Sequence, residues 1–192
     1  MTQGSGKDSI LKKHRVVLKD FYKFQLPAVL GYTLTAIACA AAALMLSENG
    51  GVLFWASLAV VVFMTALLII LLISVLRNAP MKYAEQVADF PEDVQDELLL
   101  EYSSAKKVGT QRYMSRVMVF FRVRNIYAVQ YKDITGAAPK NRDLLLYLKD
   151  SEEPLHIPCP ANNMSAIVFA YLRSKNPDIK IIGSADRKET TV

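Results

Sequence analysis

Two uninterrupted apolar stretches decide the class of this protein: LPAVLGYTLTAIACAAAALML at residues 26–46 and VLFWASLAVVVFMTALLIILLISVL at residues 52–76. They are 21 and 25 residues long and contain no charged side chain. A helix that advances about 1.5 Å per residue crosses the hydrocarbon core of a bilayer, roughly 30 Å, in about 20 residues. Helices buried in soluble proteins almost never have uncharged runs of this length. Both stretches are therefore predicted to be transmembrane helices.

The residues that flank the two stretches predict their orientation. Residues 47–51 are short, rich in turn formers and free of lysine and arginine, which predicts a tight antiparallel hairpin. Basic residues lie at the opposite ends of both stretches: Lys7, Lys12, Lys13, Arg15, Lys19, Lys23, Arg77 and Lys82. The positive-inside rule then places both termini in the cytoplasm. The sequence predicts a multi-pass protein of the cell (plasma) membrane whose residues 1–25 form a basic cytoplasmic arm, with His14 exposed to solvent.

The first predicted helix is rich in small residues, and its role has more than one interpretation. The residues with small-xxx-small spacing or close to it are Gly31, Thr35, Ala36, Ala40 and Ala43. Such spacing lets helix backbones approach closely, either within the hairpin or between two copies in a homodimer. A cleaved signal peptide is disfavoured by the length of the stretch and of the arm before it. A lipoprotein signal at Cys39 is disfavoured because the chain stays apolar after this residue. Pro27 is expected in the first turn of this helix.

Residues 77–183 have the composition of one small charged domain. Residues 77–105 are predicted to be helical, with a start signal at residues 89–92. The alternation of residues 117–124 predicts a strand with one buried face, and residues 126–131 predict a second strand. Two further strands are expected at residues 144–148 and 155–157, after a polar loop at residues 137–142.

The C-terminal part is predicted to close this domain with a helix. Its apolar face has helical spacing, and Asn162 or Asn163 is the expected cap; the face is Met164, Ile167, Val168, Tyr171 and Leu172. Residues 184–192 are predicted to be a disordered tail. The predicted fold class is therefore a membrane α-hairpin plus a small α+β domain, with an antiparallel sheet between a linker helix and a C-terminal capping helix.

Three short segments carry a resemblance to a known group of proteins. They are Lys107-Val108-Gly109, Tyr131-Lys132-Asp133-Ile134 and the sequence RSKNPDI at residues 173–179. In this order, after two membrane helices, they resemble uncharacterised bacterial membrane proteins with a cytoplasmic pleckstrin-homology-like (PH-like) domain, over roughly residues 79–183. The resemblance implies a PH-like sheet and a binding or regulatory module, not an enzyme, and it implies no particular ligand. The strands predicted above are fewer than a complete PH-like half-barrel requires.

A run of seven bases without an acid is the candidate binding surface of the domain. It consists of Lys106, Lys107, Arg112, Arg116, Arg122, Arg124 and Lys132. Close to a membrane, each base attracts anionic lipid headgroups by about 1 kcal/mol. The alternative is that these bases pair with the acidic helix at residues 85–101. From Arg77 onward there are seventeen bases against fifteen acids, so the small excess argues against nucleic-acid binding.

No catalytic motif, metal-ligand set or cofactor fingerprint was found in the sequence. His156 and Cys159 supply only two of about four ligands that a zinc site needs, so they are interpreted as structural. The chain is predicted to be no enzyme and to bind no cofactor, metal or nucleic acid. Two functions remain: a membrane-anchored scaffold or sensor for a protein partner or anionic lipid, or an accessory subunit of a transporter or envelope-assembly complex that acts through its hairpin.

Overall fold

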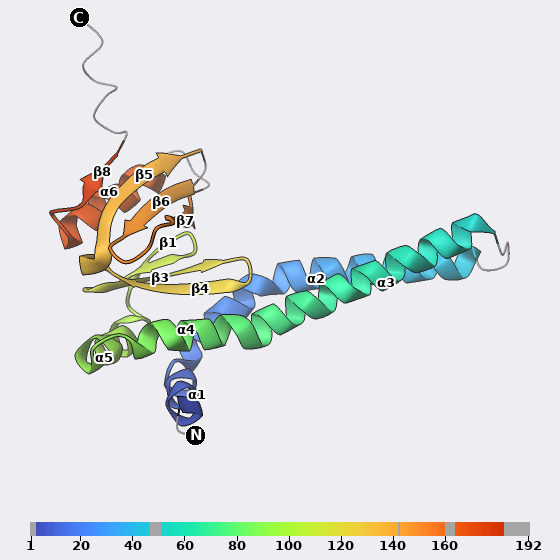
Figure 1. Cartoon of the computed structure of the whole chain (residues 1–192), viewed down its shortest axis with the longest axis horizontal. Coiled ribbons are helices and arrows are strands. Elements are labelled where there is room, and N and C mark those ends of the chain that lie inside the picture. The colour runs from blue at the N-terminus through green and yellow to red at the C-terminus, as the bar shows by residue number, and fades with distance from the viewer. Residues whose placement is uncertain (1–2, 47–50, 142, 160–163, 183–192) are drawn as a thin grey trace, which may run out of the picture.

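The computed structural model describes residues 3–46, 51–141, 143–159 and 164–182, and it consists of two long helices joined to a small domain (Figure 1). The helical part comprises α1 (Gln3–Lys13), α2 (Arg15–Leu46), α3 (Val52–Ile73), the π-helical turn η2 (Ser74–Asn78), α4 (Ala79–Ala88) and α5 (Glu92–Glu101). Most of the predicted connector, and the predicted tail at residues 184–192, lie outside the described residues. Two long apolar helices and a small domain with antiparallel strands and helices are present, as the sequence predicted.

Helices α2 and α3 are long and apolar enough to cross a membrane. They pack side by side, and their outer faces are left open (Figure 1). Leu34, Trp55 and Phe63 are more than 60% exposed, and very little of either apolar stretch is buried. A helix in the core of a soluble protein would bury such side chains, because exposing them to water is costly. The two helices therefore differ from the core helices of a soluble protein in how little of their apolar surface is buried.

Helix α2 begins eleven residues before the predicted membrane stretch, so the expected helix start next to Pro27 is wrong. Pro27 lies inside the helix, not in its first turn. The reason is that residues 14–25 carry a second apolar stripe, which includes the fully buried Val17 and Phe21. His14 also belongs to this buried side, with 1% of its surface exposed, and its Nδ1 is 2.8 Å from the Tyr83 hydroxyl. The expectation that His14 is solvated is therefore wrong.

The first sheet is an antiparallel meander of four strands that lies on the helices. Its strands are β1 (Lys106–Val108), β2 (Gln111–Tyr113), β3 (Val117–Arg122) and β4 (Asn125–Gln130), in that order. Strand β3 is buried on both faces, which corrects the prediction of one buried face. Val119 and Phe121 point into a core shared with α2, η2, α4 and α5, whereas Met118 and Phe120 point into a second core.

The second sheet covers the other face of β3 and contains one strand, β5, that the sequence analysis missed. After the turn η3 (Tyr131–Asp133) it contains β5 (Ile134–Lys140), β6 (Asp143–Leu148), β7 (Leu155–Pro158) and β8 (Lys180–Ile181), in the order β7-β6-β5-β8. Neighbours are antiparallel except β5 and β8. Most of the predicted loop at residues 137–142 is therefore strand, because Ala137 and Ala138 are small enough to pack in the core between sheet and helix.

Helix α6 (Met164–Lys175) closes the second core, as predicted. Val168 and Leu172 are fully buried on its inner face, and Asn176 after its end donates from Nδ2 to the carbonyls of Tyr131 and Ile134 at 2.8 and 2.9 Å. The expected cap at residues 162–163 lies outside the described residues. The described part of the domain thus has two four-stranded sheets between a helical layer and one closing helix.

Candidate functional site

The candidate site is the junction where α2 leaves the domain and becomes the first apolar helix. The buried Phe21 ring lies against Phe121 of β3, with 5.8 Å between ring centroids. One turn further on, Gln25 donates from Nε2 to the backbone carbonyl of Arg122 at 3.0 Å. Gln25 directly precedes the apolar stretch, so this bond holds the tip of the β3–β4 hairpin next to the start of that stretch (Figure 1).

A charged cluster fixes the other side of this junction. Arg112 of β2 forms an ion pair with Asp20 of α2 at 2.5 Å, and its guanidinium lies over the Tyr102 ring, 4.6 Å from the centroid. Burial, together with the negative charge of Asp20, raises the pKa of Tyr102 well above its ordinary value. The Tyr102 hydroxyl therefore stays protonated and donates to the Asp20 carboxylate at 3.3 Å. Asp20, in the arm before the membrane stretch, is a site residue that the sequence analysis missed.

Between α2 and the β1–β2 turn lies a cavity of about 360 Å³ whose lining includes three bases and one acid. Its lining residues are Asp20, Lys23, Phe24, Lys107, Gly109, Thr110, Arg112 and Phe121. Gly109 has a positive φ of 59°, which a two-residue hairpin turn requires and glycine adopts without strain. Thr110 Oγ1 is buried and has no hydrogen-bond partner within the described residues. A buried hydroxyl next to lysines and an arginine is suited to a small anionic group.

The β3–β4 hairpin adds two arginines to the same end of the sheet. Arg122 pairs with Asn125 at the end of the ladder, which leaves Val123 and Arg124 as the turn. The alternation of residues 117–124 predicted Arg122 and Arg124 on one strand face. This is wrong, because Arg124 has a φ of 68° and lies in the turn. Val123 is 62% exposed at the tip. Neither arginine forms a side-chain ion pair with any described residue, so both positive charges remain available.

The seven predicted bases do not form one surface. Arg116, at the opposite end of β3, pairs with Asp93 and Glu97 of α5 at 2.6 and 2.5 Å, as the alternative interpretation of the basic run predicted. The hydrogen bond from Arg116 lowers the pKa of Asp93 below its usual value. Lys106 lies over the Tyr171 ring at 4.7 Å from the centroid, and Lys132 is exposed in η3, beyond the far end of β4. Only part of the predicted set is therefore next to the apolar helices.

The small residues of α2 are also divided by the structure. Ala43 is buried and Ala36 and Ala40 are half-buried, which corresponds to the interpretation of close packing within the hairpin. Gly31 and Thr35 are exposed, and no atom lies within 4 Å of a Cβ built on Gly31. The small residues therefore lie on two different faces of the helix, one packed within the hairpin and one open.

The described residues contain no group of three or more His, Cys, Asp or Glu side chains that could hold a metal ion. His156 Nδ1 lies 3.3 Å from Asp143, and the Cys159 thiol is buried beside Gln111. Burial raises the pKa of this thiol, which makes it a poor nucleophile. No family model, no curated protein and no solved structure matches this chain, so functional assignment depends on the geometry of the junction.

Proposed function

We propose that this chain is a non-enzymatic integral membrane protein whose cytoplasmic PH-like domain binds anionic lipid headgroups of the inner leaflet, as a membrane-anchored scaffold or sensor. The observation that carries the proposal is the bond between Gln25 and the Arg122 carbonyl. It keeps a hairpin with two arginines, neither in an ion pair with a described residue, at the level where the first apolar stretch begins.

Several features support a retained membrane hairpin with cytoplasmic ends. The apolar side chains of α2 and α3 are exposed over most of their length, as lipid-facing side chains are. Val17 and Phe21 belong to the core of the domain, so cleavage of the first helix as a signal sequence would remove core residues. The flanking lysines and arginines favour the inner side of the membrane for both termini.

The order of the elements supports the PH-like identity of the domain. A four-stranded meander is followed by a second antiparallel set of strands and then by a closing helix. Residues from both sheets and from α6 share one core, in which Phe120, Leu146 and Leu172 are fully buried. The described residues form eight strands, more than the sequence predicted, which supports this identity.

The position of the bases supports a lipid surface at one end of this domain. We define the headgroup surface as Lys23, Lys107, Arg122 and Arg124, which come from α2, β1 and the β3–β4 hairpin. Lys23 precedes Leu26 by three residues, about 4.5 Å along a helix, which is within the headgroup layer of a bilayer. At about 1 kcal/mol per base near an anionic surface, four bases make a substantial attraction that salt weakens.

Hydrogen–deuterium exchange on the full chain in nanodiscs tests this proposal. Nanodiscs of phosphatidylcholine alone are compared with nanodiscs that also contain phosphatidylglycerol, at low and high salt. We expect slower exchange at residues 109–110 and 122–125 in the anionic nanodiscs at low salt, and loss of this protection in Arg122→Ala/Arg124→Ala. Lys132→Ala is the matched control, because its base lies about 20 Å along β4 from the hairpin tip. Equal exchange in both lipids, or an equal effect of the control, would contradict the proposal.

The second candidate is an accessory subunit that acts through its membrane hairpin. The outward-facing Gly31 and Thr35 favour it, because small residues on an open helix face allow another helix to approach closely. Gly31→Leu is expected to abolish co-purification of a membrane partner while the exchange pattern of the soluble domain stays unchanged. Ala41→Leu, at another exposed small residue of α2, is the control. Unchanged co-purification in Gly31→Leu would remove this candidate.

A further inference from the structure

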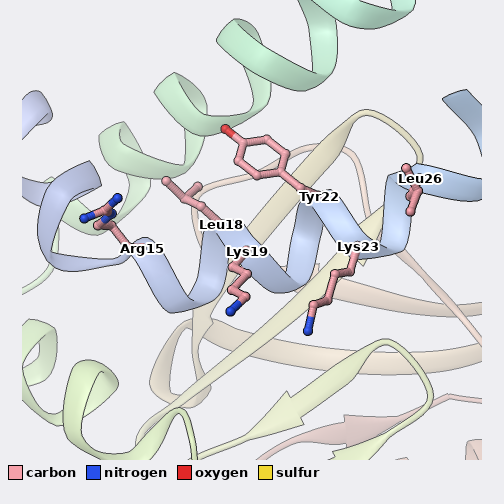
Figure 2. A pocket seen from close by; sticks show the side chains of 6 residues that line it. All are labelled: Arg15, Leu18, Lys19, Tyr22, Lys23 and Leu26. Carbon is pink, nitrogen blue, oxygen red and sulfur yellow. The ribbon is translucent and has the colours of Figure 1, made fainter.

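A second feature of the junction is an open groove along α2. Of the headgroup-surface bases, only Lys23 lines it. It has a volume of about 730 Å³ and is lined by one stripe of the helix: Arg15, Leu18, Lys19, Tyr22, Lys23 and Leu26 (Figure 2). The stripe lies on the side of α2 away from the buried Val17 and Phe21. Leu18 is half-buried and packs against the helical core, whereas the other five lining residues are exposed.

The groove combines positive charges with an apolar surface. Three of its lining residues are basic and none is acidic. Lys19 and Lys23 are four residues apart, which places their side chains next to each other on the helix. Figure 2 shows these two lysines projecting together on one side of α2, with Leu18 and Tyr22 on another side. The nearby acid Asp20 forms its ion pair with Arg112 and not with these lysines.

The position of the groove along α2, relative to the start of the apolar stretch, agrees with this chemistry. Leu26 is the first residue of the apolar stretch and is 53% exposed. Lys23 and Lys19 lie about 4.5 and about 10 Å before it along the helix axis. Once α2 spans a bilayer, Leu26 reaches the acyl chains, Tyr22 lies at the interface, and the two lysines lie among the headgroups.

We propose that this groove holds one anionic phospholipid of the cytoplasmic leaflet, with its phosphate between Lys19 and Lys23 and the upper part of its acyl chains against Tyr22 and Leu26. The proposal rests on the membrane insertion in the proposed function, but the bound lipid occupies α2 and not the sheet. It makes the first membrane helix itself selective for a lipid class, independently of the β3–β4 hairpin.

Fluorescence quenching by brominated lipids tests this site in the full chain. Trp55 is the single tryptophan and lies at the start of α3, so it reports on insertion of the other end of the hairpin. A second protein with Trp55→Phe and Tyr22→Trp reports on the groove. Both are reconstituted in phosphatidylcholine with a minor amount of phosphatidylglycerol, and the bromine is carried by one lipid or by the other.

We expect the reporter at position 22 to be quenched preferentially by the brominated anionic lipid, and Trp55 to be quenched by both lipids without that preference. Each of Lys19→Gln and Lys23→Gln is expected to lower the preference at position 22 about fivefold, the equivalent of about 1 kcal/mol. Arg124→Ala is the control, since it removes a base of the headgroup surface and should leave the preference unchanged.

The outcomes separate this inference from the proposed function. If Trp55 is quenched but position 22 shows no anionic preference, or if Arg124→Ala removes the preference as fully as Lys19→Gln, the groove site is wrong while membrane insertion stands. If position 22 is quenched by neither lipid while Trp55 is quenched, another protein segment or a second copy covers the groove, and the inference is overturned. If Trp55 is quenched by neither lipid, the membrane insertion itself fails.

Discussion

Replacement of Phe21 by alanine tests whether the N-terminal arm is part of the domain core. The Phe21 side chain is completely buried between α2 and β3, and its ring lies 5.8 Å from that of Phe121. A buried phenylalanine removes roughly 150–250 Å² from water, worth about 4–6 kcal/mol at about 25 cal/mol per Å². Measured truncations of buried phenylalanine cost about 3–5 kcal/mol. We therefore expect Phe21→Ala to lower the free energy of unfolding of the domain by about 4 kcal/mol.

The assay has to separate the domain from the membrane helices. Far-ultraviolet circular dichroism would be dominated by α2 and α3, so we would follow the exchange of β3 and β4 amides in the full chain in detergent micelles, with added denaturant. Val16→Ala is the matched control on the same helix, because Val16 is 53% exposed, and a surface change of this kind costs less than about 0.5 kcal/mol. Combining Phe21→Ala with Phe121→Ala should give a coupling of about 0.5–1.5 kcal/mol for the ring pair.

If Phe21→Ala costs no more than Val16→Ala, α2 does not share a core with the first sheet. The packing that holds the tip of the β3–β4 hairpin next to the first apolar stretch would then be absent. That result would restore the simpler interpretation of residues 1–25 as a solvated basic arm.

Three further predictions test separate parts of the fold. Burial, and next the charge of Lys13, lower the pKa of His14 from 6.5 to about 4. Because the unfolded chain binds this proton at a higher pH than the folded chain does, the free energy of unfolding should fall as the pH drops from about 6.5 to 4. A comparison of denaturation midpoints with His14→Gln should isolate that loss. Arg116→Ala should raise the pKa of Asp93 toward its usual value, as followed by NMR titration; an unchanged pKa would show that the ion pair does not form in solution. Gly136→Ala would bring a Cβ to 3.2 Å from the Lys180 carbonyl oxygen at the start of β8. The Ile182 amide, which donates to the Ala137 carbonyl of β5 at 2.8 Å, should then exchange faster, while the exchange of β3 amides should not change.

The shared core also limits which experiments are informative. A fragment that begins at residue 79 would lack Val17, Phe21, Leu71 and Val75, all of which are buried against the helical side of the first sheet. It would expose Val119 and Phe121 to water, so lipid binding measured on such a fragment would report on an opened core. The full chain is therefore the appropriate material for each test.

Local patterns were enough to predict several elements. The hairpin follows from the length of two uncharged stretches, because a bilayer imposes a minimum span on any helix that crosses it. Helix α6 follows from apolar residues at helical spacing, of which Val168 and Leu172 are buried as expected. The three-residue strands β1 and β2 were missed, because three residues are too few for a period of two to be recognised.

What the sequence by itself determined is the number of apolar helices, the charges that flank them and the presence of a small α+β domain after them. Only the tertiary structure decided that β3 is buried on both faces, that residues 14–25 belong to the core, and which bases are free. Arg112 and Arg116 are neutralised by acids 92 and 23 residues away in the chain, whereas the side chains of Arg122 and Arg124 form no ion pair with any described residue. Such pairings depend on how strands and helices stack, and contacts between distant residues leave no periodic signal in the sequence around either partner.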